Sequence, residues 1–476
     1  MDIEEFRKNG HDTVDWIADY FQNIEEFPVK SQASPGDVIN RLPVRPPEEP
    51  ESFAELMKDL DKLIIPGITH WQSPSFFAYF NANNSYPSIL AEMITAALGA
   101  QCMSWQTSPA ATELEEQMMN WIASLINLPD GFTGVIQDTA STATLCSLLT
   151  AREKFSNFSA NNEGICKNRK FRIYCSSEAH SSIDKAVRIA GLGSDNLIKV
   201  GVDKNFSLDI EKLENAIKND LTKGYKPLAI IAALGTTGST SVDPLQKIGE
   251  LCQSYGIWYH IDAAYAGTAL MLDSNSKYKP GIALADTFVF NPHKWMFTNF
   301  DCSAYYVRDR DALVRTFSIL PEYLKTSEGD TVNNYRDWGI ALGRRFRALK
   351  LWFVLRSYGV KGLKKKISDH IKWAEELSKD IIEHSEFELL APVPFATVCF
   401  RYHPKDINDE DLLNKLNNSL MEELNRSGKL YLTHTKLNGR FTIRLVIGQT
   451  HQSRDHIVKA WEIINKTAEN LKKDLM

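Results

Sequence analysis

The chain has 476 residues, of which 43% are hydrophobic and 24% are charged. These proportions are ordinary for a soluble globular protein, so disordered, collagen-like and fibrous classes are excluded. With 54 Lys and Arg against 60 Asp and Glu, the net charge is −6. The one short basic run, 364–366, is too small to neutralise a phosphate backbone, and we expect no nucleic-acid partner.

The seven cysteines are scattered, odd in number, and form no C-x-x-C pair. We therefore expect reduced thiols and no metal site. The first residues, MDIEEFRKNGHDTVDW, lack the basic-then-apolar order of a signal peptide, and no window approaches about 20 apolar residues. We expect a cytoplasmic protein without a membrane partner.

The first part of the chain combines amphipathic helical stretches with a proline-rich linker, SPGDVINRLPVRPPEEPES. This part is too punctuated to hold a core of its own. We expect residues 1–85 to form a helical extension of a larger body.

Short apolar runs then alternate with helical patterns, which is typical of a mainly parallel α/β sheet with helices on both faces. The expected strands are 171–175, 228–234, 257–262, 287–291 and 303–308. We assign residues 86–360 to this large domain. In such sheets ligands bind beyond the carboxyl ends of the strands, so the residues that follow each run are candidates for a site.

The last part of the chain has a different pattern. Helices are expected at 361–385, 408–427 and 451–473, and strands at 395–403 and 440–448. Residues 361–476 are therefore expected to form a small α+β domain.

Three polar residues, Asn291, His293 and Lys294, stand at the end of the run TFVFNPHK. A lysine at the mouth of a parallel sheet is costly to desolvate unless its amine is used, and a desolvated amine is a good nucleophile toward carbonyl groups. A lone lysine after a strand is far more often an ordinary surface residue, so its neighbours decide the interpretation.

Asp262 ends the run IWYHID and is followed by small residues, which let a flat ligand approach the backbone. A lysine and a carboxylate are the pair that pyridoxal phosphate requires, one for a Schiff base and one to keep the pyridine nitrogen protonated. His180 follows another expected strand and could stack on a cofactor ring. Taken singly, Asp262 could be a helix cap and His180 a capping or core histidine.

Residues suited to a phosphate group occur at two further places. Thr139, Ala140 and Ser141 precede an apolar helical run, and Thr237 lies in the hydroxyl-rich turn LGTTGSTSVD. Such turns are common, so each is weak alone. No G-x-x-x-x-G-K-[ST], complete G-x-G-x-x-G or H-E-x-x-H pattern occurs, which argues against nucleotide and zinc sites. The expected convergence of these two hydroxyl-bearing turns with Lys294, Asp262 and His180 in one sheet favours a pyridoxal phosphate site.

Several segments in a fixed order resemble the group II pyridoxal-phosphate decarboxylases, and among these the aromatic L-amino-acid decarboxylases. They are SPAATELE, EAHSS, HIDAAYAG, NPHKW and LGRRFRALKLWFV. The similarity covers nearly the whole chain. It implies fold type I, a pyridoxal phosphate cofactor and a homodimer with shared active sites, in which residues 1–85 help the subunits to associate. The segment QDTASTATL looks more bacterial than animal.

The resemblance also implies roles for individual residues. Lys294 matches the Schiff-base lysine, Asp262 the partner of the ring nitrogen, and His180 the ring-stacking histidine. Further cofactor positions are Thr139, Ala140, Ser141, Thr237, Asp243, Asn291 and His293. Tyr323, in the loop with PEYLK, matches the proton donor, which phenylalanine replaces in related plant enzymes that make aldehydes.

By resemblance, apolar and aromatic residues form the substrate pocket. They are Trp71, Tyr79, Phe80, Ala82, Met103 and Gly343. These residues suit an aromatic ring, and no arginine is evident to hold a side-chain carboxylate. Gly343 stands where serine marks histidine decarboxylases and many plant tyrosine decarboxylases. The chain departs from animal members at Asn81, Ala82, Gln101 and Met103.

We therefore expect a lyase that decarboxylates an aromatic L-amino acid (tryptophan, tyrosine, DOPA, 5-hydroxytryptophan or phenylalanine) to the arylalkylamine and CO2. An oxygen-consuming aromatic aldehyde synthase and a histidine decarboxylase are alternatives on the same scaffold. A non-enzymatic protein is disfavoured by the intact set of site residues. One methylene or hydroxyl in an apolar pocket is worth only about 1–3 kcal/mol, so the residues do not rank the substrates.

Overall fold

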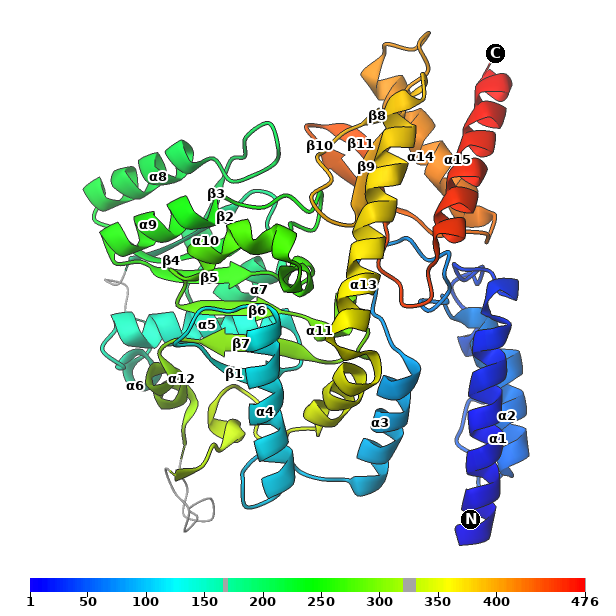
Figure 1. Cartoon of the computed structure of the whole chain (residues 1–476), viewed down its shortest axis with the longest axis horizontal. Coiled ribbons are helices and arrows are strands. Elements are labelled where there is room, and N and C mark those ends of the chain that lie inside the picture. The colour runs from blue at the N-terminus through cyan, green and yellow to red at the C-terminus, as the bar shows by residue number, and fades with distance from the viewer. Residues whose placement is uncertain (166–169, 320–330, 476) are drawn as a thin grey trace. The chain divides into compact units, whose positions relative to one another are not determined.

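The computed structural model describes residues 1–165, 170–319 and 331–475 (Figure 1). The chain divides into two compact units. Unit 1 comprises Met1–Asn81, Glu376–Leu390 and Cys399–Met476, and unit 2 comprises Ala82–Glu375 and Ala391–Val398. The expected division at residues 85 and 360 stays a prediction.

Within its described residues, unit 2 is built on a seven-stranded sheet with the order β1-β7-β6-β5-β4-β2-β3. The strands are β1 (Thr133–Gln137), β2 (Phe171–Ser176), β3 (Leu197–Val200), β4 (Lys226–Ala233), β5 (Trp258–Asp262), β6 (Thr287–Phe290) and β7 (Ser303–Val307). The five strands from β6 to β3 are parallel, whereas β7 runs antiparallel to both of its neighbours, β6 and β1. The expected mainly parallel α/β sheet is confirmed. All strands except β7 therefore end at the same edge.

Helices cover both faces of this sheet (Figure 1). One face carries α5 (Ala140–Phe155), α7 (Ser182–Ile189) and α12 (Arg310–Phe317), and the other carries α8 (Ile210–Thr222) and α9 (Leu245–Tyr255). The alternation of side chains along β5 follows this division. Trp258 donates to Ser147 of α5 (2.9 Å), whereas the Tyr259 hydroxyl donates to the Leu245 carbonyl of α9 (2.9 Å).

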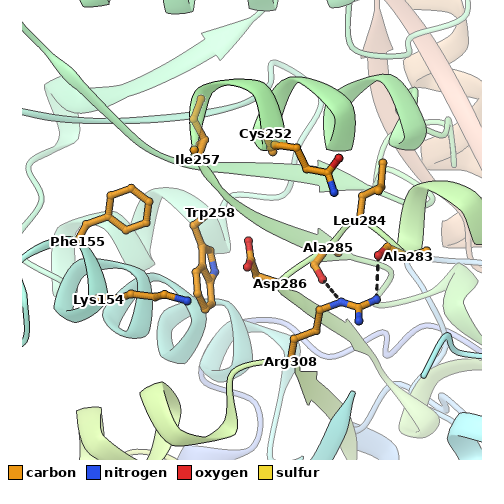
Figure 2. A pocket seen from close by; sticks show the side chains of 12 residues that line it. Lys154, Phe155, Cys252, Ile257, Trp258, Ala283, Leu284, Ala285, Asp286 and Arg308 are labelled. Atoms are coloured by element: carbon orange, nitrogen blue, oxygen red, sulfur yellow. Dashed lines mark hydrogen bonds between the residues drawn. The ribbon is translucent and has the colours of Figure 1, made fainter. Parts of the chain in front are cut away.

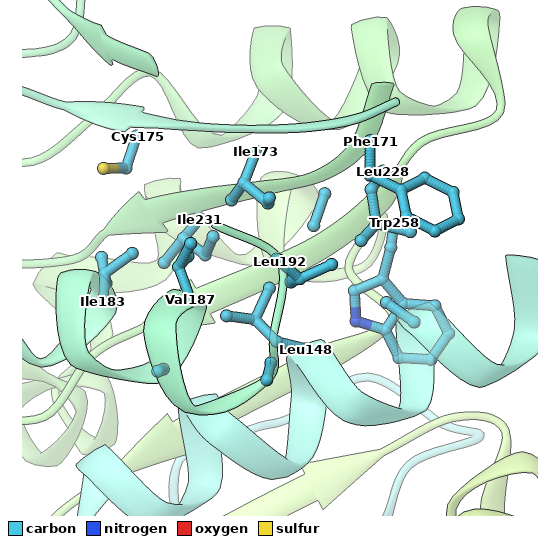
Figure 3. Close-up of a cluster of buried hydrophobic side chains, with 14 of the residues drawn as sticks. Leu148, Phe171, Ile173, Cys175, Ile183, Val187, Leu192, Leu228, Ile231 and Trp258 are labelled. Carbon is cyan, nitrogen blue, oxygen red and sulfur yellow. The ribbon is translucent and has the colours of Figure 1, made fainter. Parts of the chain in front are cut away.

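An apolar core lies between α5, α7 and the strands β2 and β4 (Figure 3). Alternate residues of β2 enter it, namely Phe171, Ile173 and Cys175, and α7 contributes Ile183 and Val187, four residues apart. Each of these side chains is at most 3% exposed. Burial of a large apolar side chain contributes about 1.5–3 kcal/mol, so this core holds the strand ends in place.

The remaining α-helices that begin in unit 2 are α3 (Tyr86–Leu98), α4 (Pro109–Leu125), α6 (Ala160–Glu163), α10 (Lys279–Ile282), α11 (Pro292–Trp295) and α13 (Arg347–Glu383). The long helix α13 is interrupted at Gly359, where φ is 62° and ψ is 166°. Only glycine adopts this conformation readily. The helix expected from residue 361 begins just after this interruption.

Unit 1 joins the two ends of the chain. Its sheet has the order β10-β11-β9-β8, in which β10 pairs antiparallel with β11 and β8 with β9. The strands are β8 (Phe387–Leu389), β9 (Thr397–Tyr402), β10 (Thr433–Leu437) and β11 (Arg440–Val446). The first two residues of β9 are counted with unit 2. The helices are α1 (Ile3–Gln22), α2 (Phe53–Asp59), α14 (Glu410–Arg426) and α15 (Arg454–Leu475). The expected small α+β fold of the C-terminal part of the chain is confirmed.

The N-terminal segment packs within unit 1. The backbone N–H of Phe77 donates to the Tyr431 carbonyl (3.0 Å), and the Phe77 carbonyl accepts from Val446 (2.9 Å). Among the described residues, every helix is too short or too polar to cross a bilayer. A cytoplasmic location stays a prediction.

Candidate active site

Lys294 lies in α11, the single turn that follows β6. Its backbone N–H donates to the Asn291 carbonyl (2.9 Å), and its own carbonyl accepts a hydrogen bond from the Asn83 side chain. Burial around the amine lowers the pKa of Lys294, and the nearby Asp262 carboxylate acts in the opposite direction. A lowered pKa increases the share of neutral, nucleophilic amine.

Asp262 is the last residue of β5, and it pairs with Ala233 of β4 on one side and Val289 of β6 on the other. Its Oδ1 accepts a hydrogen bond from the backbone N–H of Ala264 (3.0 Å). The carboxylate therefore lies between the exits of two parallel strands, and it interacts electrostatically with Lys294.

His180 follows β2 and remains exposed. Its Nδ1 is hydrogen-bonded to the Ser182 hydroxyl (2.8 Å) and accepts from the Ser182 backbone N–H (3.1 Å). Partial desolvation lowers the pKa of the imidazole, while Asp262 raises it and Lys294 lowers it. The three residues expected from sequence therefore lie at one edge of the sheet, close enough for two of them to affect the pKa of the third.

The first turn of α5 lies at the same edge, after β1. Thr139 is the N-cap residue, and its Oγ1 accepts from the Thr142 backbone N–H (3.3 Å). Ala140 and Ser141 follow in the first turn, where N–H groups have no acceptor within the helix. Such a turn, with the positive end of the helix dipole, suits a phosphate group.

Asn291 and His293 are buried and support the turn that carries the lysine. Asn291 Oδ1 accepts a hydrogen bond from Ser303 Oγ of β7 (2.7 Å), and His293 Nδ1 accepts from the Cys302 backbone N–H (2.9 Å). Burial, with a smaller effect of Lys294, lowers the pKa of His293 to about 3. The imidazole is therefore neutral near neutral pH, which its role as a hydrogen-bond acceptor requires, because a protonated imidazole has no free lone pair.

Thr237 and Asp243 lie in different environments in the structure. Thr237 is exposed in the turn after β4. Asp243 is buried, and its carboxylate accepts from the backbone N–H groups of Ala233 (2.7 Å) and Leu208 (2.9 Å). Burial raises the pKa of Asp243 to about 6. Asp243 thus secures the end of β4, and its support of a cofactor ring stays a prediction.

Residues 35–403 match the family model described as the pyridoxal-dependent decarboxylase conserved domain. The chain belongs to this family. It is 44% identical to phenylacetaldehyde synthase of Arabidopsis thaliana, over 99% of its own length and 97% of the relative's. It is 43% identical to tyrosine decarboxylase 2 of Narcissus pseudonarcissus, over 98% and 95% of the two chains. The crystal structure of Oryza sativa TDC with PLP and tryptamine matches with a TM-score of 0.96 and 34% identity over 99% of both chains.

The relatives named above are plant proteins, so the expectation of a bacterial type of sequence is not borne out. The segment QDTASTATL, at 137–145, covers the end of β1 and the start of α5. Its Ala143 and Thr144 are fully buried. Thr139 caps the helix and the two buried residues pack in the core, so the segment has a local structural role.

Pyridoxal phosphate is the cofactor of this decarboxylase family, and the residues at the sheet edge fit it. A desolvated amine, a carboxylate between two strand exits and a helix N-terminus meet the needs of its aldehyde, ring nitrogen and phosphate. Gly235, in the turn after β4, has a φ of +92°, and a Cβ there would lie 2.9 Å from the Ala266 Cβ, so this turn packs closely against the residues that follow β5.

The expected substrate-pocket residues of the decarboxylase fall in both units. Trp71, Tyr79 and Phe80 belong to unit 1, and Ala82, Met103 and Gly343 to unit 2. In unit 2, Gly343 borders a cavity of about 360 Å³, where a Cβ at this position would lie 3.3 Å from Gln101 Nε2. Tyr323 lies outside the described residues. The pocket therefore stays a prediction.

A second cavity of the decarboxylase, of about 480 Å³, lies at the opposite edge of the sheet (Figure 2). Trp258 at the start of β5 and Asp286 just before β6 line it. Arg308 also lines it and donates to the carbonyls of Ala283 and Ala285, both at 2.8 Å. These side chains close the ends of the strands that face away from the candidate active site.

Sequence reasoning missed His260, which lies two residues before Asp262 and faces α5. The available signal was the alternation along IWYHID, because residues two apart in a strand share a face. A histidine on the same face as Asp262 is therefore expected to lie beneath it.

Proposed function

We propose that the chain decarboxylates aromatic L-amino acids to arylalkylamines and CO2. The observation that carries this proposal is the meeting of Lys294, Asp262 and His180 at one sheet edge, where each of the other two affects the pKa of His180. Relatives named tyrosine decarboxylase and tryptophan decarboxylase support an aromatic substrate.

The chain's residues divide the work of holding and orienting. Lys294 would hold the cofactor aldehyde, Asp262 would keep a proton on the ring nitrogen, and the first turn of α5 would bind the phosphate. His180 would stack on the ring. When bound, the cofactor supplies an electron sink for the negative charge left at Cα as CO2 departs.

Tyr323 is proposed to return a proton to Cα, which completes formation of the amine. The 44% identity to a phenylacetaldehyde synthase favours a second candidate, oxidative formation of an aldehyde on the same scaffold. The retained tyrosine favours the simple decarboxylation, because the resemblance associates phenylalanine at this position with aldehyde formation.

We also propose a homodimer. The helix α3 presents apolar side chains to solvent that are between 41% and 60% exposed, namely Tyr86, Leu90, Met93, Ile94 and Leu98. A contiguous apolar face of this kind is typical of a protein–protein interface. Sedimentation of the purified protein tests this, and Leu90→Asp together with Ile94→Asp should yield monomers.

The test of the function is a competition assay. Purified protein with pyridoxal phosphate receives equal amounts of tryptophan, tyrosine, DOPA, 5-hydroxytryptophan, phenylalanine, histidine and glutamate, and amines, aldehydes and peroxide are measured together. We expect aromatic amines without peroxide, and loss of product in Lys294→Ala. Tyr323→Phe should divert product to aldehyde. Aldehyde with peroxide from the unmodified protein would instead support the second candidate, and turnover of histidine or glutamate alone would contradict both.

A further inference from the structure

Beneath the candidate site, five side chains form a continuous hydrogen-bonded network. Trp258 Nε1 donates to Ser147 Oγ (2.9 Å), which is bonded to Thr287 Oγ1 (2.7 Å). Thr287 Oγ1 is bonded to His260 Nδ1 (2.8 Å). His260 Nε2 is bonded to Thr144 Oγ1 (3.1 Å). Every member is at most 1% exposed, so each bond is shielded from water.

The network connects three elements that each carry a different part of the site. Helix α5, whose first turn is the phosphate side, contributes Thr144 and Ser147. Strand β5, which ends in the candidate acid, contributes Trp258 and His260. Strand β6, which leads into the turn with the lysine, begins with Thr287. Movement of one element against another would break at least one buried bond.

Within this network, His260 bonds two other elements through the two nitrogens of one ring. Its Nδ1 reaches β6 and its Nε2 reaches α5. Burial lowers the pKa of His260 to about 4, so the ring is neutral near neutral pH. It shares a face of β5 with Asp262, roughly 6.6 Å away along the strand. Because the His260 imidazole is neutral, the negative charge of Asp262 stays available to the pyridine nitrogen of the cofactor.

We propose that His260 is a positioning residue that fixes α5 against β5 and β6, and so sets the spacing between the phosphate-binding turn, Asp262 and Lys294. The inference rests on the cofactor roles proposed above. A loss of one buried bond of the network would loosen the phosphate side relative to the ring side without removing any group that touches the cofactor.

The sharpest variant is Thr144→Val, which removes one hydroxyl with little change of shape. Thr150→Val is the matched control, because Thr150 is a fully buried threonine of the same helix whose hydroxyl donates to the Cys146 carbonyl (2.8 Å) instead. Thr144→Ser keeps the hydroxyl and should restore the bond. His260→Asn, which retains an acceptor near Nδ1 and loses Nε2, tests the ring itself.

The readouts are the rate at which holoenzyme releases pyridoxal phosphate and the visible circular dichroism of the bound cofactor. We expect Thr144→Val and His260→Asn to release it roughly 3- to 10-fold faster, the range for one hydrogen bond, with an altered dichroic band. Thr150→Val and Thr144→Ser should match the unmodified protein. If His260→Asn does not fold, Thr144→Val alone decides the matter.

Equal release rates and equal dichroism in Thr144→Val and Thr150→Val would overturn the inference, even if both variants melt at lower temperature. Failure of the proposed function has a different signature. An unmodified holoenzyme that retains its cofactor and turns over no aromatic amino acid would contradict the function, and the release rates would still test the network.

Discussion

His293 and Cys302 exchange two hydrogen bonds across the turn that carries the candidate lysine. The backbone N–H of His293 donates to the Cys302 carbonyl (3.2 Å), and the Cys302 N–H donates to Nδ1 of the imidazole (2.9 Å). Cys302 directly precedes β7. The position of Lys294 therefore depends on the strand that runs against the others.

Removal of this imidazole should destabilise the holoenzyme. In His293→Ala the Cys302 N–H keeps its burial and loses its acceptor, which costs about 1–3 kcal/mol. Urea denaturation measures the change in the free energy of unfolding. His11→Ala, at an exposed histidine of α1, is the control and should change it by less than about 0.5 kcal/mol. Equal effects of the two variants would contradict this role of His293.

Buried histidines should make the protein sensitive to mild acid. Burial lowers the pKa of His260 to about 4 and those of His293 and His370 to about 3, whereas a histidine in the unfolded chain titrates near 6.5. Between these values the unfolded chain binds more protons, so the free energy of unfolding falls as the pH is lowered from about 6.5 to 4. The raised pKa of Asp243, about 6, acts with the opposite sign.

A single variant isolates one of these protons. His370→Asn keeps an acceptor for Trp295 Nε1, which donates to His370 Nδ1 at 3.0 Å, and removes the titrating group. We expect the slope of unfolding free energy against pH between 6 and 4.5 to fall by about 1.4 kcal/mol per pH unit, since the opposing carboxyl is present in both proteins. Parallel curves for the two proteins would contradict the assignment.

Charge at the end of β5 should matter more than shape. Asp262→Asn keeps Oδ1 for the Ala264 N–H and removes the negative charge, so we expect the cofactor to remain bound and kcat to fall about 10²- to 10³-fold. Steady-state kinetics with an aromatic amino acid measures this. The control is Asp286, whose carboxylate accepts from the Tyr259 N–H at the opposite edge of the sheet (2.7 Å). Asp286→Asn should change kcat less than about 3-fold. A comparable loss in both variants would assign the effect to the sheet.

The space beside Gly343 should influence which aromatic amino acid the enzyme prefers as substrate. A Cβ there would lie 3.3 Å from Gln101 Nε2, so Gly343→Ser narrows the cavity that these residues border. We expect the ratio of kcat/KM for tryptophan to that for tyrosine to fall about 10-fold. Adding Gln101→Ala should recover part of the ratio because it restores volume. An unchanged ratio would remove Gly343 from the substrate pocket.

The sequence by itself determined the fold class and named the residues of the candidate site, whose roles stay predictions. Each of the expected strands in the large sheet is a run of mostly buried and mostly apolar residues, and such runs can be recognised without knowledge of their partners. The residues that follow those runs, Lys294, Asp262 and His180, meet because parallel strands end at one edge. The strands β1 and β3 escaped detection. β3, LIKV, has only one buried residue and lies at the sheet edge, where the apolar signal is weak.

Tertiary structure alone decided the direction of β7 and the partners of the buried polar groups. The register between β7 and both neighbours depends on residues far away in the chain, and no local pattern encodes it. In the same way, His260 meets Thr144 across 116 residues and Asp243 meets Leu208 across 35. A buried donor or acceptor must find a partner, but its residue type does not say which one, because only the packed elements bring the two atoms within hydrogen-bonding distance.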